Sequence, residues 1–236
     1  MEIKGGIELP ARRENIELRT SDGLTLVGEL ALPLHSEAIA TIVALHPLPT
    51  AGGFIDSHII RKIAARLPAL ADLAVLRFNF RGVSSPRGTS EGAFGHGDDE
   101  KHDLEAAMAF VVERKLPAPW MLGWSFGTEV ALKHGLDCAV EGAILLSPPL
   151  HRTSGAELSA WAGSGKRMIV LIPELDDYLR PAEAVERFAV VPEADIVAVE
   201  GGKHLWVGEQ QTRRVLTEIV SRLNPGVLPL PEEWAG

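Results

Sequence analysis

Apolar residues along the chain follow two patterns that alternate from residue 38 onward. Continuous apolar runs are typical of strands buried on both faces, and apolar residues spaced three and four positions apart indicate helices. The alternation predicts an α/β fold with a mostly parallel sheet and helices on both faces. The apolar runs lie at residues 38–45, 73–80, 120–122, 140–146, 168–172 and 195–199, and the helical patterns at 55–67, 98–115, 128–133, 181–188 and 207–223.

The two ends of the chain differ from this alternation. Residues 15–20 and 24–32 alternate polar and apolar positions around the turn Ser21-Asp-Gly23, which predicts an antiparallel hairpin before the parallel strands. Residues 224–236 are too rich in proline for a helix, so we expect this tail to lie along the surface or against a partner subunit. We therefore expect residues 1–236 to form one domain with a core of about residues 15–223.

Composition narrows the class of protein. The chain has 236 residues, of which 23% are charged and 46% hydrophobic, as in ordinary globular proteins. The net charge of −9 argues against binding to nucleic acid, which requires a basic surface. No apolar run is long enough to span a membrane, and residues 1–7 lack the apolar segment of a signal peptide. Cys138 is the only cysteine, which fits a reducing compartment, so we expect a cytoplasmic protein without nucleic-acid or membrane partners.

A G-x-S-x-G pentapeptide, Gly123-Trp-Ser-Phe-Gly127, lies between a predicted strand and a predicted helix. A serine at a sharp turn from strand to helix is typical of a nucleophile elbow. Glycines on either side would remove the side chains that crowd such a turn. The alternative, a serine that only caps a helix, does not account for the preceding strand. Ser125 is therefore the candidate nucleophile.

A serine hydroxyl needs a base, and the base needs an acid that orients it. Such groups are expected at the carboxyl ends of parallel strands. Asp176 follows the strand predicted at 168–172, and His204 follows the strand predicted at 195–199. The order Ser125, Asp176, His204 is that of the α/β-hydrolases. Asp177 and Glu174 lie so close to Asp176 that the identity of the acid remains open.

Other polar residues favour structural interpretations. We expect His46 to hold its loop by hydrogen bonds and His151 to be a surface loop histidine. The acidic and histidine residues of 96–102 fit no common metal-ligand spacing and suit the first turn of a helix. Arg77 and Arg81 border a buried strand, where we expect them to pair with carboxylates. Trp124 is expected to pack beneath the elbow.

Several motifs resemble one known family. The chain is similar to small bacterial α/β-hydrolases without a cap domain, related to the dienelactone hydrolases, over about residues 24–223. The resemblance implies the α/β-hydrolase fold, an oxyanion loop, an elbow, an acid turn and a histidine turn. The motifs that carry it are His46-Pro47 with Gly52-Gly53, Arg77-Phe-Asn-Phe-Arg-Gly82, Gly123–Gly127, Pro173-Glu-Leu-Asp176 and Gly202-Lys-His204.

The chain also departs from this family. Ser125 stands where dienelactone hydrolases have a cysteine, so lactone opening is not implied. Leu48 replaces a histidine that is frequent in related loops, and Ser84 replaces a glycine. These changes concern the nucleophile's chemistry and the shape of the pocket, and they leave the Ser–Asp–His order intact.

An oxyanion hole requires N–H donors aimed at the charge that develops during the reaction. The N–H of Phe126, at the start of the helix, is the first candidate. Pro47 and Pro49 have no N–H, so Leu48 is the second. Residues 147–167 are too few for a helical cap, which predicts an open, shallow site for small, soluble substrates.

These residues together predict a serine hydrolase that cleaves a carboxylic ester or thioester of a small soluble substrate through an acyl-enzyme. The chemistry needs no cofactor and no metal. An acyltransferase or a thioesterase would use the same triad, and a non-catalytic scaffold with a binding role is a further alternative. The sequence leaves open whether the chain is a monomer or a homodimer.

Overall fold

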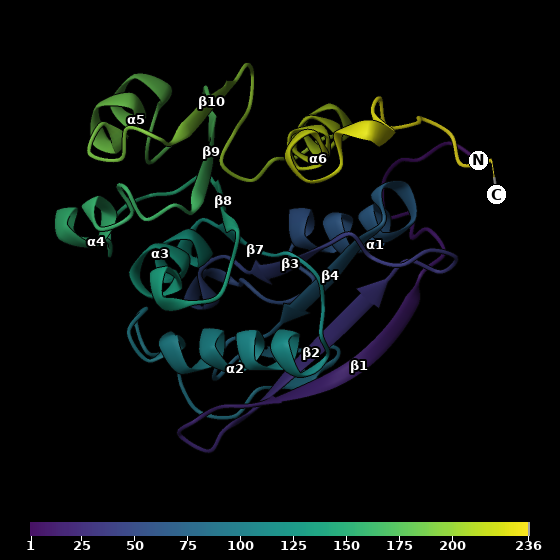
Figure 1. Cartoon of the computed structure of the whole chain (residues 1–236), viewed down its shortest axis with the longest axis horizontal. Coiled ribbons are helices and arrows are strands. Elements are labelled where there is room, and N and C mark those ends of the chain that lie inside the picture. Colours follow the sequence, from purple (N-terminus) through teal and green to yellow (C-terminus); the bar gives the residue numbers. More distant parts are fainter. Residues whose placement is uncertain (236) are drawn as a thin grey trace.

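Within residues 1–235, eight strands form one sheet, in the order β1-β2-β4-β3-β7-β8-β9-β10 (Figure 1). The computed structural model describes residues 1–235. The N-terminal hairpin is antiparallel and β2 pairs antiparallel with β4, whereas the remaining pairs are parallel, as predicted. The strands are β1 (Arg12–Arg19), β2 (Thr25–Leu32), β3 (Ala40–Leu45), β4 (Leu73–Phe78), β7 (Pro119–Trp124), β8 (Gly142–Leu146), β9 (Arg167–Pro173) and β10 (Asp195–Val199). A ribbon of β5 (Ser84–Ser85) and β6 (Gly88–Thr89) was not predicted, because two residues are too few to show a period.

Helices cover both faces of the sheet. On one face, α1 (His58–Ala71) and α6 (Glu209–Leu223) pack against residues such as Ile42 and Ala44 of β3. On the other, α2 (Glu100–Glu113), α3 (Phe126–His134) and α5 (Pro181–Phe188) pack against Val43 and Leu45. Successive residues of one strand therefore face two different cores, which explains the continuous apolar runs. Between β8 and β9 the chain adds only the short helix α4 (Gly155–Ser159), so no cap domain covers the sheet.

Helix α1 runs past the end predicted for it. The helical pattern of apolar residues ended at residue 67, and Pro68 has no N–H for the hydrogen bond to the carbonyl of Ala64. In the structure Pro68 lies inside the helix, which continues to Ala71. The Ala64 carbonyl instead accepts a hydrogen bond from Arg13 Nη2, 3.0 Å away. A side chain from β1 thus supplies the donor that proline lacks, and local sequence could not predict it.

Charged side chains buried beside the sheet form paired networks. Glu29 of β2 is 3% exposed and accepts hydrogen bonds from Arg77 Nε at 3.0 Å and Arg87 Nη1 at 2.7 Å. The same two arginines bind Asp56, in the loop before α1. Arg77 is therefore structural, as predicted from its position, and it ties the 52–57 loop to the sheet.

The termini lie side by side (Figure 1). The N–H of Trp234 donates to the carbonyl of Met1 at 2.7 Å, and the N–H of Ile3 donates to the carbonyl of Glu232 at 2.8 Å. The C-terminal tail thus lies along the surface of its own chain, with Leu230 buried against the α1–α6 face.

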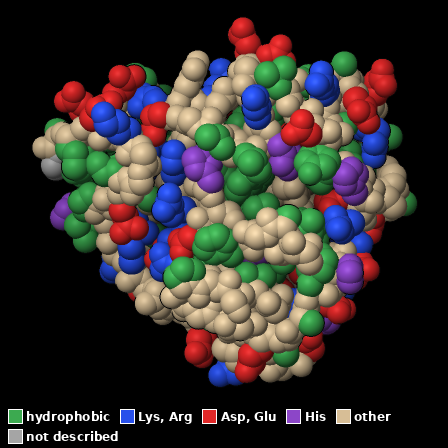
Figure 2. Space-filling model, turned by 180° about the vertical axis from the view of Figure 1, so that it is seen from behind, with side chains coloured by type: hydrophobic (Ala, Val, Ile, Leu, Met, Phe, Trp, Pro, Cys, Tyr) green, Lys and Arg blue, Asp and Glu red, His purple; other side chains and the backbone are tan. Residues whose placement is uncertain are grey.

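The surface carries charges of both signs. On the face in Figure 2, acidic and basic side chains intermingle around the edge, hydrophobic side chains gather nearer the middle, and histidines lie both near the middle and toward the sides. Within residues 1–235, no helix is both long and apolar enough to cross a membrane.

Candidate active site

The turn from β7 to α3 holds Ser125 in a strained backbone conformation, with φ 53° and ψ −117°. This region is disfavoured for residues with a side chain. A Cβ on Gly127 would lie 2.1 Å from the carbonyl oxygen of Leu45, and a Cβ on Gly123 would lie 2.5 Å from the backbone of Gly127. Both positions therefore require glycine, and the turn leaves Ser125 partly exposed at the carboxyl end of the sheet.

Ser125, His204 and Asp176 form a continuous chain of hydrogen-bonding groups. His204 Nε2 lies 2.9 Å from Ser125 Oγ, and His204 Nδ1 lies 3.0 Å and 3.2 Å from the two carboxylate oxygens of Asp176. Asp176 is buried, whereas Asp177 is exposed, and Glu174 accepts a hydrogen bond from the N–H of Gly201 instead. Of the three candidate acids, the fold thus brings Asp176 to the histidine.

The turn that carries Asp176 also fixes its charge state. Asp176 Oδ1 accepts hydrogen bonds from the N–H groups of Tyr178 at 2.8 Å and Leu179 at 3.3 Å. Burial raises the pKa of Asp176, but the hydrogen bonds from His204 and from these N–H groups outweigh it and hold the pKa below its ordinary value. Asp176 is therefore ionised at neutral pH and able to orient His204 Nδ1–H.

Three side chains hold the loop of His204. Trp124 Nε1 donates to the carbonyl of His204 at 3.0 Å, and Ser147 Oγ donates to the same oxygen at 3.3 Å. From the other side, His58 Nε2 donates to the carbonyl of Trp206 at 2.9 Å. Trp124 packs beneath the elbow as expected, and only 3% of its surface is exposed. Its hydrogen bond also holds the loop that carries His204. This role of His58 could not be predicted from the sequence, because Trp206 is far away along the chain.

The His46 loop lies beside the elbow and has the structural role predicted for His46. His46 Nδ1 donates to the carbonyl of Pro47 at 2.7 Å, and Nε2 accepts from the N–H of Phe80 at 3.0 Å. This arrangement needs the neutral ring, and burial lowers the pKa of His46 to about 4.

The two candidate oxyanion donors both line the cleft. The carbonyl of Leu48 accepts hydrogen bonds from Ala51 and Gly53, at 3.0 Å and 2.9 Å, which fixes the turn of this loop. Phe126 is the first residue of α3, so its N–H has no partner within the helix. Both residues border the cavity that contains Ser125. The arrangement keeps Leu48 and Phe126 as candidates, and their role remains a prediction.

The burial of His46 predicts a pH dependence of stability. The free histidine protonates near 6.5 and the folded one only near 4, so the unfolded chain binds more protons between these values. The free energy of unfolding should therefore fall as pH falls from about 6.5 toward 4. Urea unfolding across this range should show a smaller loss for His46→Gln. The control is His35→Gln, which changes an exposed histidine and should keep the loss. An unchanged pH dependence in His46→Gln would contradict the assignment.

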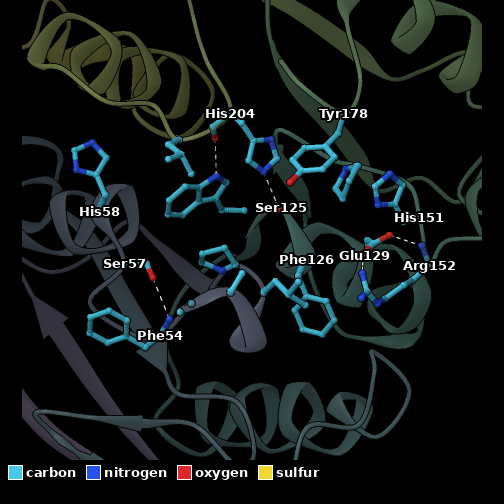
Figure 3. A pocket seen from close by; sticks show the side chains of 18 of the residues that line it. Phe54, Ser57, His58, Ser125, Phe126, Glu129, His151, Arg152, Tyr178 and His204 are labelled. Atoms are coloured by element: carbon cyan, nitrogen blue, oxygen red, sulfur yellow. Dashed lines mark hydrogen bonds and ion pairs between the residues drawn. The ribbon is translucent and has the colours of Figure 1, made fainter. Parts of the chain in front are cut away.

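A cleft of about 400 Å³ surrounds Ser125 and extends to both sides of it (Figure 3). Phe54, Ser57 and His58 line one end, from the loop before α1 and its first turn. The other end is formed by residues that follow β8 and β9, together with the first turn of α3. These are Glu129, Pro149, His151, Arg152 and Tyr178. The expected shallow site is therefore a two-ended cleft that is open to solvent.

The structure also bears on the predictions made for His151 and for residues 96–102. His151 is exposed, as expected of a surface loop histidine, and it also lines the cleft. The residues of 96–102 form a helix start, as predicted: buried Glu100 accepts hydrogen bonds from the N–H groups of Gly95 and Gly97. Within residues 1–235, no group of three or more His, Cys, Asp or Glu side chains is arranged to hold a metal ion.

Comparison with known proteins identifies similar folds. No protein-family model and no curated protein matches the sequence. Among solved structures, an α/β serine hydrolase without a lid from Xanthomonas campestris is 26% identical, with a TM-score of 0.71 over 96% of this chain and 99% of that one. An α/β serine hydrolase homologue from Coxiella burnetii is 22% identical, with a TM-score of 0.75 over 89% of this chain and 97% of that one.

An esterase from Pyrococcus furiosus is 20% identical, with a TM-score of 0.70 over 90% of this chain and 93% of that one. At 20% sequence identity, this similarity shows a shared fold and nothing finer. The narrower relation to dienelactone hydrolases remains a prediction. The sheet order, the strained serine elbow and the likeness to serine hydrolases without a lid together identify the chain as a member of the α/β-hydrolase superfamily that lacks a cap domain.

Proposed function

We propose that the chain is a serine hydrolase that cleaves a carboxylic ester or thioester of a small, soluble substrate through an acyl-enzyme. The observation that carries this proposal is the hydrogen-bonded chain from Ser125 through His204 to Asp176, opening onto the cleft. In the proposed roles, Ser125 is the nucleophile, His204 the general base and Asp176 the orienting acid.

The proposed reaction begins with transfer of the Ser125 proton to His204 Nε2 as Oγ attacks the acyl carbonyl. The negative charge that forms on the carbonyl oxygen is stabilised by the N–H groups of Leu48 and Phe126. Asp176 stabilises the imidazolium. The tetrahedral species then collapses, and His204 gives its proton to the leaving alkoxide or thiolate. Water, deprotonated by His204, attacks the acyl-enzyme, releases the acid and restores Ser125.

The surroundings of Ser125 support a soluble substrate. The segment between β8 and β9 contributes only the short helix α4 and leaves the cleft open. Solved structures similar to this chain include a serine hydrolase described as without a lid and an esterase. A site without a lid has no element to open at a lipid surface, so small molecules that diffuse from solution are the natural substrates.

Covalent labelling tests the proposal. A fluorophosphonate probe should label the folded protein at one site, and mass spectrometry should locate the adduct on Ser125, because the reagent needs a serine activated by a base. Ser125→Ala should abolish labelling, whereas the control Ser159→Ala, which changes an exposed serine of α4, should keep it. Absence of labelling in correctly folded protein, or an adduct only on another serine, would refute the assignment.

A further inference from the structure

The loop after β8, which carries Arg152, is held in place by a buried carboxylate. Glu129 lies in the first turn of α3 and is fully buried. One of its oxygens accepts a hydrogen bond from the backbone N–H of Arg152, and the other accepts from Arg152 Nη1 at 3.2 Å. The same loop contains Ser147 and Leu150 in left-handed conformations, with φ 50° and 54°. Glu129 therefore fixes a strained loop so that the Arg152 side chain borders the cleft.

The Arg152 guanidinium lies next to the elbow. Its Cζ is 5.5 Å from the centre of the Phe126 ring, and Phe126 follows Ser125 directly. Figure 3 shows the Arg152 side chain between Glu129 and Phe126 at one end of the cleft. The side chain is 31% exposed. Among the hydrogen bonds of residues 1–235, none uses Arg152 Nε or Nη2 as donor. One edge of the guanidinium thus remains available to a ligand in the cleft.

The charges around this edge favour a carboxylate. Both oxygens of Glu129 are already engaged, so Glu129 offsets the charge of Arg152 without occupying its remaining donors. The other cleft carboxylate, Asp56, lines the cleft beside Ser57 and His58, and it is paired with two arginines. A planar guanidinium edge beside apolar surface is suited to a carboxylate, which accepts two parallel hydrogen bonds.

We propose that the Arg152 end of the cleft binds a carboxylate group carried by the substrate. The preferred substrates would then be half-esters of dicarboxylic acids, or esters whose alcohol part carries a carboxylate. This inference rests on the proposed ester hydrolysis and specifies its substrate class. Arg152 makes no bond to the reacting atoms, so its effect should appear mainly in KM.

Matched pairs of esters test the inference on the unaltered protein. The first pair is the monoethyl ester of adipic acid and ethyl heptanoate, which differ by a carboxylate on the acyl part. The second is 3-carboxyphenyl butyrate and 3-methylphenyl butyrate, which differ on the alcohol part. We expect kcat/KM to be about tenfold higher for the charged member of one pair, since hydrogen bonds to charged groups have about this effect. The pair that shows the preference identifies the part of the substrate that lies beside Arg152.

Variants then assign the effect to Arg152. Arg152→Lys keeps the charge but loses the planar edge, and the double variant Glu129→Gln with Arg152→Gln removes both charges without leaving one of them buried and unpaired. Both should lower the preference by about tenfold while hydrolysis of the neutral ester persists. Arg61→Gln, on the exposed face of α1, removes one positive charge elsewhere and should leave the preference unchanged.

The outcomes separate this inference from the proposed function. Hydrolysis of the neutral esters at rates equal to or above those of the charged esters would overturn the carboxylate site and leave ester hydrolysis standing. A preference that survives in both Arg152 variants would also overturn it. No hydrolysis of any of the four esters by the folded protein would contradict both proposals.

Discussion

Replacement of Asp176 by asparagine is expected to lower kcat/KM about 10⁴-fold, the size of effect known for removal of a triad carboxylate. His204 Nδ1 lies 3.0 Å and 3.2 Å from the two oxygens of Asp176, which accept its proton and hold the ring toward Ser125. An asparagine amide can donate to Nδ1 and thereby stabilise the wrong tautomer, in which Nε2 is protonated and unable to act as a base. The rate should be measured with an activated ester at neutral pH.

The adjacent carboxylate provides the matched control. Asp177→Asn makes the same chemical change one residue away, on an exposed side chain, and should leave kcat/KM close to that of the unaltered protein. Circular dichroism and thermal unfolding should show that both variants are folded. An equal loss in the two variants, or a loss confined to Asp177→Asn, would mean that the hydrogen bonds around His204 have been assigned the wrong role.

Glu29→Gln is expected to lower the free energy of unfolding by about 3–5 kcal/mol, the cost of leaving buried charges without their partner. Glu29 is 3% exposed and contacts three guanidinium groups, those of Arg77, Arg87 and Arg13. Arg77 is itself 1% exposed, so it cannot turn to water when Glu29 loses its charge. Urea unfolding at neutral pH measures the change.

The control for this prediction is Glu17→Gln on β1. Glu17 is 69% exposed and lies 3.7 Å from exposed Arg19, and such surface pairs contribute little to stability. The control should therefore unfold at nearly the same urea concentration as the unaltered protein. A small effect of Glu29→Gln would contradict the inferred importance of the buried network.

Glu29 also predicts how the free energy of unfolding changes at low pH. Burial raises the pKa of Glu29, but Arg77, Arg87 and Arg13 outweigh burial, and the pKa lies below its ordinary value of 4.5. A carboxyl whose folded pKa is lowered contributes stability above its unfolded pKa and loses it as the pH falls toward the folded value. Glu29→Gln should therefore show a weaker loss of stability below about pH 4.5 than the unaltered protein.

This network also connects the fold to the cleft. Asp56 lines the cleft and is bound by the same Arg77 and Arg87 that bind Glu29. The 52–57 loop, which forms one end of the cleft, is thus tied to strands β2 and β4 through charged groups. Loss of these ion pairs should make the 52–57 loop more mobile. The hydrogen bond between Ser125 and His204 should be affected less.

Much of the fold followed from local periodicity. Strands buried on both faces appear as continuous apolar runs, and amphipathic helices repeat every three to four residues, so their order could be predicted without any partner. The elbow could be predicted from its own motif, although the contact that requires Gly127, with Leu45 of β3, is made only in the folded chain. The order of Ser125, the acid and His204 followed because each comes after a predicted strand, and parallel strands end at the same edge.

Features that depend on residues distant along the chain could be read only from the folded structure. Asp176 and Asp177 both follow β9, and only the turn bonded to the N–H groups of Tyr178 and Leu179 directs Asp176 to His204. The carbonyl of Ala64, which Pro68 leaves without a donor in α1, accepts a hydrogen bond from Arg13 of β1.

The side chains that line the cleft also depend on the tertiary structure. His58 begins helix α1, whereas His151 and Arg152 lie in the loop after β8, and no spacing in the sequence shows that the two segments meet beside Ser125. The layers of the fold and the residue types at the ends of its strands could be predicted without the structure, because they depend on local period and turn chemistry. The choice of acid and the chemistry of the cleft required the folded chain, since they depend on the direction in which loop side chains point.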